Sequence, residues 1–338
     1  MIPQLRHPLP ARARAWVDSL APHAVADVTP IGGGMTNTKW VVHLVDEGPL
    51  VIRWSDPHEW GDTGREHVRR EALACRLLAG SGLPVPELLG SDLDGTTAGG
   101  PANLMTWLPG RVRLDRLGPA AITNWARLAV AVHEQPVPAD RWPPAFTFRG
   151  SAEPAVPTWV RWPSRWRRAI DILNAGPPST SQGLLHRDFH LDNTLWQGDG
   201  VSGLVDWAEA SWGPSDLDVA HACSDFAMLH TTADGEAFRR AYLEQGGRLD
   251  PDPDAARFWI VSDILGFLRT RLTSSLLWVP AARTCPLKSS DRAWKTCLYR
   301  HSPDLDGRLT PPHPWPMVLS RRAGRQLKLI ALALLLTK

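Results

Sequence analysis

One short segment of the chain combines residues that can act on a hydroxyl group and on phosphate. Residues 186–193 read HRDFHLDN, and a further acid, Asp206, lies 13 residues beyond Asn193. The carboxylate of Asp188 can accept or orient the proton of an attacking hydroxyl. Asn193 and Asp206 offer an amide oxygen and a carboxylate oxygen, which are the hard ligands that Mg²⁺ prefers. Together the three side chains predict a site for phosphoryl transfer.

Two other interpretations of these residues stay open. Asp and Asn often only cap turns in loops, although that explains each residue separately and not the three together. His186, Asp188 and His190 also form an H-x-D-x-H pattern, which could hold a metal ion for hydrolysis. Because the sequence shows no further histidine cluster with clear ligand spacing, phosphoryl transfer is the favoured interpretation.

A glycine-rich segment near the N-terminus is the candidate for a phosphate-covering loop. Gly32, Gly33 and Gly34 precede Thr36 and Asn37, between two segments that have the composition of strands. Glycine has no Cβ, so backbone N–H groups there can approach phosphate oxygens closely. A plain hairpin turn would use the same residues, and the absence of a following Gly-Lys-Ser/Thr excludes a Walker A loop. The three glycines, Thr36 and Asn37 are therefore candidate nucleotide-binding residues.

The elements that must position these residues change in character along the chain. β-branched and apolar runs predict strands early in the sequence, and apolar residues at helical spacing predict helices later. The predicted strands are 40–45, 50–54, 101–108, 193–196 and 204–207, and the predicted helices are 65–79, 120–133 and 258–278. This order predicts an α+β fold, in which a lobe with an antiparallel sheet and one helix precedes a larger, mainly helical lobe.

Composition limits the class of protein. Of the 338 residues, 43% are hydrophobic and 21% are charged, and the net charge is +2, so we expect a globular chain with no nucleic-acid partner. The four cysteines show no CxxC spacing and predict neither a disulfide framework nor a zinc site. The first residues lack the apolar run of a signal peptide, and the longest apolar run, 329–336, is too short to cross a bilayer. We expect a cytoplasmic protein with no membrane partner.

Two segments carry a resemblance to a known family. HRDFHLDNTLW and LVDWAEASWGPSDLDVAH resemble the aminoglycoside phosphotransferase family, the small-molecule branch of the protein-kinase-like fold. Trp207 follows Asp206 where protein kinases have Phe-Gly, which favours this branch. The resemblance implies a bilobal fold, with a nucleotide-binding N-lobe at 1–107 and a catalytic and substrate-binding C-lobe at 108–280. Residues 281–338 form a basic, proline-rich tail that does not resemble the rest.

The resemblance also implies roles for single residues of the catalytic segment. Asp188 corresponds to the catalytic base, and Asn193 and Asp206 correspond to the ligands of Mg²⁺. His186 corresponds to a brace of the catalytic loop, and Asp218 to an aspartate that bonds to the loop backbone.

Other implied roles concern bound ATP. Arg53 lies where protein kinases have a phosphate-anchoring lysine, and arginine can grip phosphate oxygens with two donors. Its predicted partner is Glu71, with Glu66 as the second candidate, although either could be a solvated helix residue. Met105 and Trp107 lie in a segment that resembles the interlobe hinge, whose backbone would pair with adenine.

These observations favour an ATP- and Mg²⁺-dependent phosphotransferase that moves the γ-phosphoryl group to a hydroxyl of a small molecule, such as an aminoglycoside-like antibiotic, a sugar or an amino alcohol. The alternative is a nucleotide-binding scaffold or pseudokinase, which the unusual Arg53 and the tail suggest. Phosphorylation of a protein is disfavoured, because the chain has no recognisable activation segment or A-P-E motif. Candidates to bind a cationic acceptor are Asp192, Glu209, Asp216 and Asp225, each of which would otherwise be a surface charge.

Overall fold

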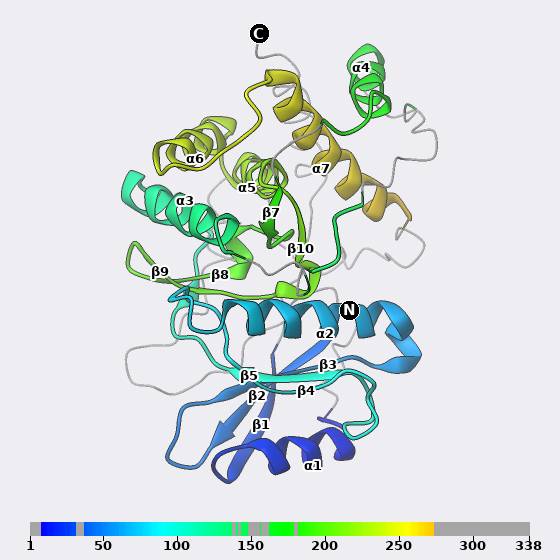
Figure 1. The fold of residues 1–338 in the computed structure, drawn as a ribbon, viewed down its shortest axis with the longest axis vertical. Coiled ribbons are helices and arrows are strands. Elements are labelled where there is room, and N and C mark those ends of the chain that lie inside the picture. Colours follow the sequence, from blue (N-terminus) through cyan, green and yellow to red (C-terminus); the bar gives the residue numbers. More distant parts are fainter. Residues whose placement is uncertain are drawn as a thin grey trace, which may run out of the picture.

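The computed structural model describes residues 8–31, 37–136, 140, 143–147, 156, 162–178 and 182–273 (Figure 1). Four predicted nucleotide-binding residues, Gly32, Gly33, Gly34 and Thr36, lie outside the described residues, and so does the tail 281–338. The described part of the chain begins with a helix and an antiparallel sheet and continues with helices and two smaller sheets.

The N-terminal sheet has five antiparallel strands in the order β1-β2-β3-β5-β4. The strands are β1 (Val25–Ile31), β2 (Thr38–Leu44), β3 (Leu50–Trp54), β4 (Leu88–Asp92) and β5 (Ala102–Thr106). Alternate residues such as Trp40, Val42 and Ile52 are buried on one face of this sheet, as the two-residue period of a strand requires. The strands predicted near 40–45, 50–54 and 101–108 are confirmed, with ends that differ by a few residues.

The helix α2 (Pro57–Leu78) lies between this sheet and the C-terminal part of the chain (Figure 1). Asp56 caps its N-terminus, since the carboxylate accepts a hydrogen bond from the backbone N–H of His58 at 2.9 Å. The predicted helix, 65–79, covers only its later turns, because Gly61 takes a non-helical conformation with φ 49° and interrupts the helical pattern.

A second helix, α1 (Ala11–Leu20), covers the opposite face of the sheet and was not predicted from the sequence (Figure 1). It buries Ala13, Trp16 and Val17 in the same core cluster as Trp40 and Ile52. These three positions have the i, i+3, i+4 spacing of an amphipathic helix, so the signal is present but short.

The C-terminal part is mainly helical and is built around one aromatic cluster. Its helices are α3 (Pro119–His133), α4 (Pro163–Asn174), α5 (Asp216–Leu229), α6 (Thr232–Glu244) and α7 (Pro253–Thr273). The fully buried Trp125 of α3 stacks on Phe189, with ring centroids 5.0 Å apart, and contacts the rings of Phe226 and Phe238. Its indole N–H donates to the hydroxyl of Thr194 at 3.0 Å. The core of this part therefore fixes the HRDFHLDN segment at Phe189, within the segment, and at Thr194, directly after it.

Two small sheets position the predicted catalytic and metal-binding residues of the C-terminal part. β7 (Gln182–Leu185) pairs with β10 (Ser211–Pro214), and β6 (Arg111–Val112), β8 (Thr194–Gln197) and β9 (Gly200–Leu204) form the other sheet. The predicted strand 204–207 is wrong, because β9 ends at Leu204 and Asp206 adopts a left-handed conformation with φ 68° that no strand accommodates. The predicted helix 120–133 is confirmed as α3, whereas α7 starts at Pro253, before the predicted residue 258.

The observed order, an antiparallel sheet with helices followed by a larger helical part, is the predicted α+β organisation. Within the described residues, no helix combines the length and the apolar character that a membrane span needs.

Replacing Trp125 by alanine should lower the free energy of unfolding by about 3–5 kcal/mol, because it removes a fully buried indole at the centre of the aromatic cluster. Equilibrium urea unfolding measures this difference. The control is Leu243→Ala, since Leu243 is an exposed apolar residue of α6, and its effect should be about 0.5 kcal/mol or less. Equal losses in the two variants would contradict the assignment of this core.

Candidate active site

A buried aspartate fixes the backbone of the HRDFHLDN segment where it leaves β7. The carboxylate of Asp218 accepts hydrogen bonds from the backbone N–H groups of His186 and Arg187, both at 2.8 Å. Arg187 has a left-handed backbone (φ 74°), a conformation that costs energy for a residue with a side chain. The two hydrogen bonds hold this turn, so the predicted contact of Asp218 with the loop backbone is present.

A chain of buried polar groups supports Asp218 in turn. Nε2 of His133 lies 3.2 Å from its Oδ2, and Nδ1 of His133 lies 2.7 Å from the hydroxyl of Tyr242. Burial alone would raise the pKa of Asp218, but its hydrogen bond and attraction to His133 outweigh burial and lower the pKa below its ordinary value. Asp218 is therefore a fixed negative charge beneath the loop.

Asp188 and Asn193 are joined within the loop. The amide Nδ2 of Asn193 donates to Oδ2 of Asp188 at 2.8 Å and to its backbone oxygen at 3.0 Å. Since the amide nitrogen is used in this way, the amide oxygen of Asn193 remains the group available to a ligand. The Asp188 side chain is 40% exposed, so a substrate can reach its carboxylate.

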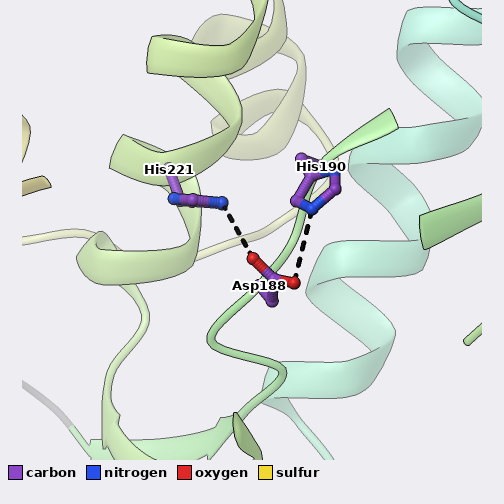
Figure 2. Close-up of side chains that lie close together, drawn as sticks. All are labelled: Asp188, His190 and His221. Atoms are coloured by element: carbon purple, nitrogen blue, oxygen red, sulfur yellow. Dashed lines mark ion pairs between the residues drawn. The ribbon is translucent and has the colours of Figure 1, made fainter. Parts of the chain in front are cut away.

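Two histidines flank the carboxylate of Asp188 (Figure 2). Nε2 of His190 lies 3.4 Å from Oδ2, and Nε2 of His221, which projects from α5, lies 3.4 Å from Oδ1. Nδ1 of His221 lies 2.7 Å from the carboxylate of Asp263 on α7. Burial would lower the pKa of His221, but Asp263 and Asp188 outweigh it and raise that pKa well above its ordinary value.

The same contacts determine the charge of Asp188. Desolvation alone would raise its pKa, but the hydrogen bonds from His190 and His221 outweigh desolvation and hold the pKa well below its usual range. Asp188 is therefore ionised at every pH at which the protein would work.

The predicted H-x-D-x-H metal group does not form with His186. That ring is fully buried, with Nε2 3.0 Å from the backbone oxygen of Val205 and Nδ1 accepting from the Asp188 N–H. His186 thus braces the loop, and His221 takes its place beside Asp188 and His190, with ligand atoms all within 4.8 Å of one another. Because Nδ1 of His190 accepts a hydrogen bond from the Asp192 N–H, the ring carries its proton on Nε2, which faces Asp188. This arrangement favours an ion-pair and hydrogen-bond cluster over a metal site.

The hairpin of β8 and β9 brings Asp206 close to the loop. The backbone N–H of Val205 donates to the backbone oxygen of Asn193 at 2.9 Å, so Asn193 and Asp206 leave the same end of the hairpin. The carboxylate of Asp206 lies between two cations, with Oδ2 2.6 Å from Nζ of Lys39 and Oδ1 2.7 Å from Nη2 of Arg53. Burial would raise the pKa of Asp206, but Arg53 and Lys39 outweigh it and hold the pKa far below its usual range.

Arg53 connects the sheet to α2 and to Asp206. Its Nε lies 2.8 Å from Oε2 of Glu71, and both side chains are almost fully buried. Oε2 of Glu71 also accepts from the side-chain amide of Asn103 on β5 at 3.0 Å. The predicted pairing with Glu71 is therefore present. The second candidate, Glu66, is wrong, because it pairs with Arg69 and Arg70 on the α2 surface.

The remaining described residues of the predicted nucleotide site lie within or next to strands of the sheet. Asn37 is buried with φ 59°, and neither of its amide atoms has a partner among the described residues. Met105 is buried, and its sulfur lies 4.0 Å from that of Cys75 on α2. Trp107, just after β5, is 41% exposed.

The four acidic candidates for acceptor binding divide into two pairs. Asp216 and Asp225 are not surface charges, because both are buried and their carboxylates accept hydrogen bonds from the backbone N–H groups of Asp250 and Leu191. Asp192 is exposed in the catalytic loop, and Glu209 is half exposed, with an oxygen 3.0 Å from Nε2 of His67. Only these two remain candidates on a surface.

Several residues at the site were not predicted from the sequence. They are Lys39, Asn103, His133, His221 and Asp263. His221 lies three residues after Asp218 in the segment that carries the family resemblance, so its place on the same helix face was foreseeable. The others come from distant elements and could be found only from the fold.

Asp218→Asn should lower the free energy of unfolding at pH 7 by about 2–4 kcal/mol, because the amide offers one acceptor where two backbone N–H groups and His133 now meet a carboxylate. The folded pKa of Asp218 is below the ordinary value of 3.8, so its contribution is complete above that pH and is lost as the pH falls through the folded value. The difference between the two proteins, measured by urea unfolding, should be constant from pH 7 to pH 5 and should narrow near pH 3. A difference that grows on acidification would contradict the assigned charge.

Comparisons with known proteins agree with this geometry. The profile of the Phosphotransferase enzyme family matches residues 27–259. Homoserine kinase of Methylorubrum populi is 28% identical over 261 residues, which cover 70% of this chain and 76% of that protein.

Solved structures show the same fold. Macrolide 2'-phosphotransferase MphH from Brachybacterium faecium is 17% identical, covers 78% of this chain and 93% of its own, and has a TM-score of 0.56. A thermostable form of aminoglycoside phosphotransferase APH(4)-Ia, solved with ADP and hygromycin B, is 18% identical, covers 78% of this chain and 92% of its own, and has a TM-score of 0.56. The predicted bilobal, protein-kinase-like α+β fold is confirmed, and the chain belongs to the phosphotransferase enzyme family.

Proposed function

We propose that this protein is an ATP- and Mg²⁺-dependent kinase that transfers the γ-phosphoryl group to a hydroxyl of a small molecule. The observation that carries the proposal is that Asp188, Asn193 and Asp206 lie close together. Asn193 donates a hydrogen bond to Asp188 within the loop, and the backbone of Asn193 pairs with the residue before Asp206 at the end of the β8–β9 hairpin. In this proposal, residues 1–107 bind the nucleotide and residues 108–280 hold the catalytic residues and the acceptor. A cytoplasmic location, with no membrane or nucleic-acid partner, belongs to the same proposal.

The oxygen atoms at this site fit a hard divalent cation. Asp206 has a carboxylate that stays ionised, and the amide nitrogen of Asn193 is directed to Asp188, which leaves the amide oxygen for a ligand. Mg²⁺ binds in this way through one or two protein oxygens together with substrate phosphates. When bound, Mg²⁺ would neutralise the charge that develops on the phosphates during transfer.

The polar groups of the N-terminal sheet fit a polyphosphate. Nη1 of Arg53 and both amide atoms of Asn37 are buried and have no hydrogen-bond partner among the described residues. Buried polar groups without partners are costly, and phosphate oxygens would supply acceptors for those that donate. The pairing of Arg53 with Glu71 holds the guanidinium in place for such a contact.

Asp188 is placed to act on the acceptor. In the transfer step, the acceptor oxygen forms a bond to the γ-phosphorus, the bond from that phosphorus to the bridging oxygen breaks, and ADP leaves. Asp188 orients the acceptor hydroxyl and takes its proton. Its low pKa makes it a weak base, which suits a loose transition state in which the proton leaves late. Asn193 and the two histidines hold the carboxylate in position.

The acceptor is proposed to be a small molecule, because the relatives have names that specify small-molecule acceptors, a homoserine kinase and antibiotic phosphotransferases among them. Asp192 and Glu209 are the exposed acids available to a cationic acceptor. Their negative charges would favour acceptors that carry an amino group, such as an aminoglycoside or an amino alcohol, over neutral sugars.

The alternative is a nucleotide-binding scaffold without transfer activity. One observation favours it: both carboxylate oxygens of Asp206 are paired with cations, so a metal ion must displace one of them. Binding of ATP without transfer to any acceptor in a broad panel would support the scaffold.

Asp188→Asn should reduce phosphate transfer by about 100-fold or more, because the amide cannot accept the hydroxyl proton. Its affinity for ATP should stay close to that of the wild type, since Asp188 faces the acceptor. The measurements are transfer of labelled γ-phosphate to a panel of metabolites and antibiotics, and calorimetric titration with ATP. Asp199→Asn, a change of an exposed acid in the β8–β9 turn, is the control and should retain full activity. Near-normal transfer by Asp188→Asn would show that Asp188 is not the base.

A further inference from the structure

Two cations from neighbouring strands share the carboxylate that is proposed to bind the metal. Lys39 on β2 lies directly opposite Arg53 on β3 in the sheet register. Their side chains reach different oxygens of Asp206, Lys39 at 2.6 Å and Arg53 at 2.7 Å. Residues directly opposite each other in a sheet project to the same face, and like charges there repel. The carboxylate between them offsets this repulsion.

The two cations are held very differently. Arg53 is almost fully buried and also pairs with Glu71, so it is fixed from two sides. Lys39 is 18% exposed, and Asp206 is the one acid that it pairs with among the described residues. Lys39 is therefore the cation that can leave Asp206 without losing a second contact.

The choice of lysine at this position is itself unusual for the chain. Lys39 is the only lysine that precedes Lys288, and every other basic side chain over that length, histidine aside, is arginine. Arginine suits a fixed, bidentate contact, whereas lysine is a compact point charge on a flexible stem. A point charge on a flexible stem can occupy a single carboxylate oxygen and then move to another anion.

The position of Lys39 in the chain points to that other anion. In the sequence, one residue, Thr38, separates Lys39 from Asn37, the last residue of the predicted phosphate-covering segment. Asn37 is buried, and its side-chain amide has no hydrogen-bond partner in the part of the chain that the structure describes. Lys39 thus follows the proposed phosphate-covering segment in the sequence, and its side chain contacts the carboxylate proposed to bind the metal.

We propose that Lys39 is a second phosphate-binding residue of the nucleotide site, which occupies the metal-binding oxygen of Asp206 until metal and nucleotide arrive and then contacts a phosphate oxygen. This inference rests on the proposed function. In both states Lys39 has an anion beside it, so the repulsion between it and Arg53 is offset throughout. Lys39 and a metal ion compete for the same oxygen, so each weakens the binding of the other to Asp206.

The first test measures the competition without nucleotide. Lys39→Met removes the ammonium group, so Mn²⁺, titrated by electron paramagnetic resonance, should bind about tenfold more tightly than to the wild type. Asp206→Asn identifies the site, because it should remove this Mn²⁺ binding. An unchanged Mn²⁺ affinity in Lys39→Met would contradict the idea that Lys39 occupies a metal position.

The second test measures the phosphate contact without metal. In an Asp206→Asn background Lys39 has lost its carboxylate partner, so any remaining effect of Lys39→Met on ATP binding comes from the nucleotide. We expect calorimetry in EDTA to show an ATP affinity about tenfold lower in the double variant than in Asp206→Asn alone. Adenosine, which has no phosphate, should bind both equally. Equal ATP affinities would overturn the proposal and leave Lys39 as a counterion of Asp206.

Three further proteins complete the design. Lys39→Arg keeps the charge and should retain ATP affinity, whereas Arg14→Met removes a charge from α1, on the opposite face of the sheet (Figure 1), and should change neither measurement. If Lys39→Met does not fold, as judged by thermal unfolding, Lys39→Gln replaces it in both tests. A wild-type protein that binds no ATP would refute the proposed function, whereas ATP binding that is indifferent to Lys39 would refute only this inference.

Discussion

Asp206 lies where two cations from adjacent strands converge, and the charge balance around it constrains the rest of the site. Lys39 and Arg53 lie opposite each other on β2 and β3, and Asp206 accepts one contact from each. Glu71 balances the buried Arg53 from α2. Breaking a buried ion pair by removing one partner leaves an uncompensated charge, which is costly. The sheet, α2 and the segment after β9 are thus tied together by one set of charges, and this set is also the part of the protein that would meet a metal ion and phosphates.

The catalytic loop depends on a different anchor. Asp218 accepts two backbone N–H groups from a turn that includes the left-handed Arg187, and His133 and Tyr242 support Asp218 from below. The carboxylate of Asp188 is positioned by Asn193 and His190 of the same loop and by His221 of α5. Strain in the backbone and low pKa values in the carboxylates occur together here, as is common where a site is organised before its substrate binds.

The family resemblance predicted the pairing of Arg53 with Glu71, which the structure contains. Local patterns in the sequence were enough to predict the fold class, because alternating strands and helical runs each depend on neighbouring residues. Predictions from these local patterns were wrong or missing where a feature depends on an unusual backbone conformation or on residues distant in the sequence. The strand expected at 204–207 ends at Leu204, because Asp206 has a left-handed backbone. The first turns of α2 were not predicted, because the non-helical Gly61 interrupts the helical pattern. Asp216 and Asp225 looked like surface acids but are buried acceptors of backbone N–H groups. The contacts of Lys39 with Asp206, and of His221 with Asp188 and Asp263, join residues whose proximity only the folded chain creates.

The most direct test of this account is the position of the metal ion in a crystal structure with Mn²⁺ and a non-hydrolysable ATP analogue, located by anomalous scattering. We expect one ion bound by the amide oxygen of Asn193 and the carboxylate of Asp206, with the terminal phosphate directed toward Asp188 and the Lys39 ammonium turned to a phosphate oxygen. An ion held instead by Asp188, His190 and His221, with Lys39 and Arg53 still paired to Asp206, would contradict it.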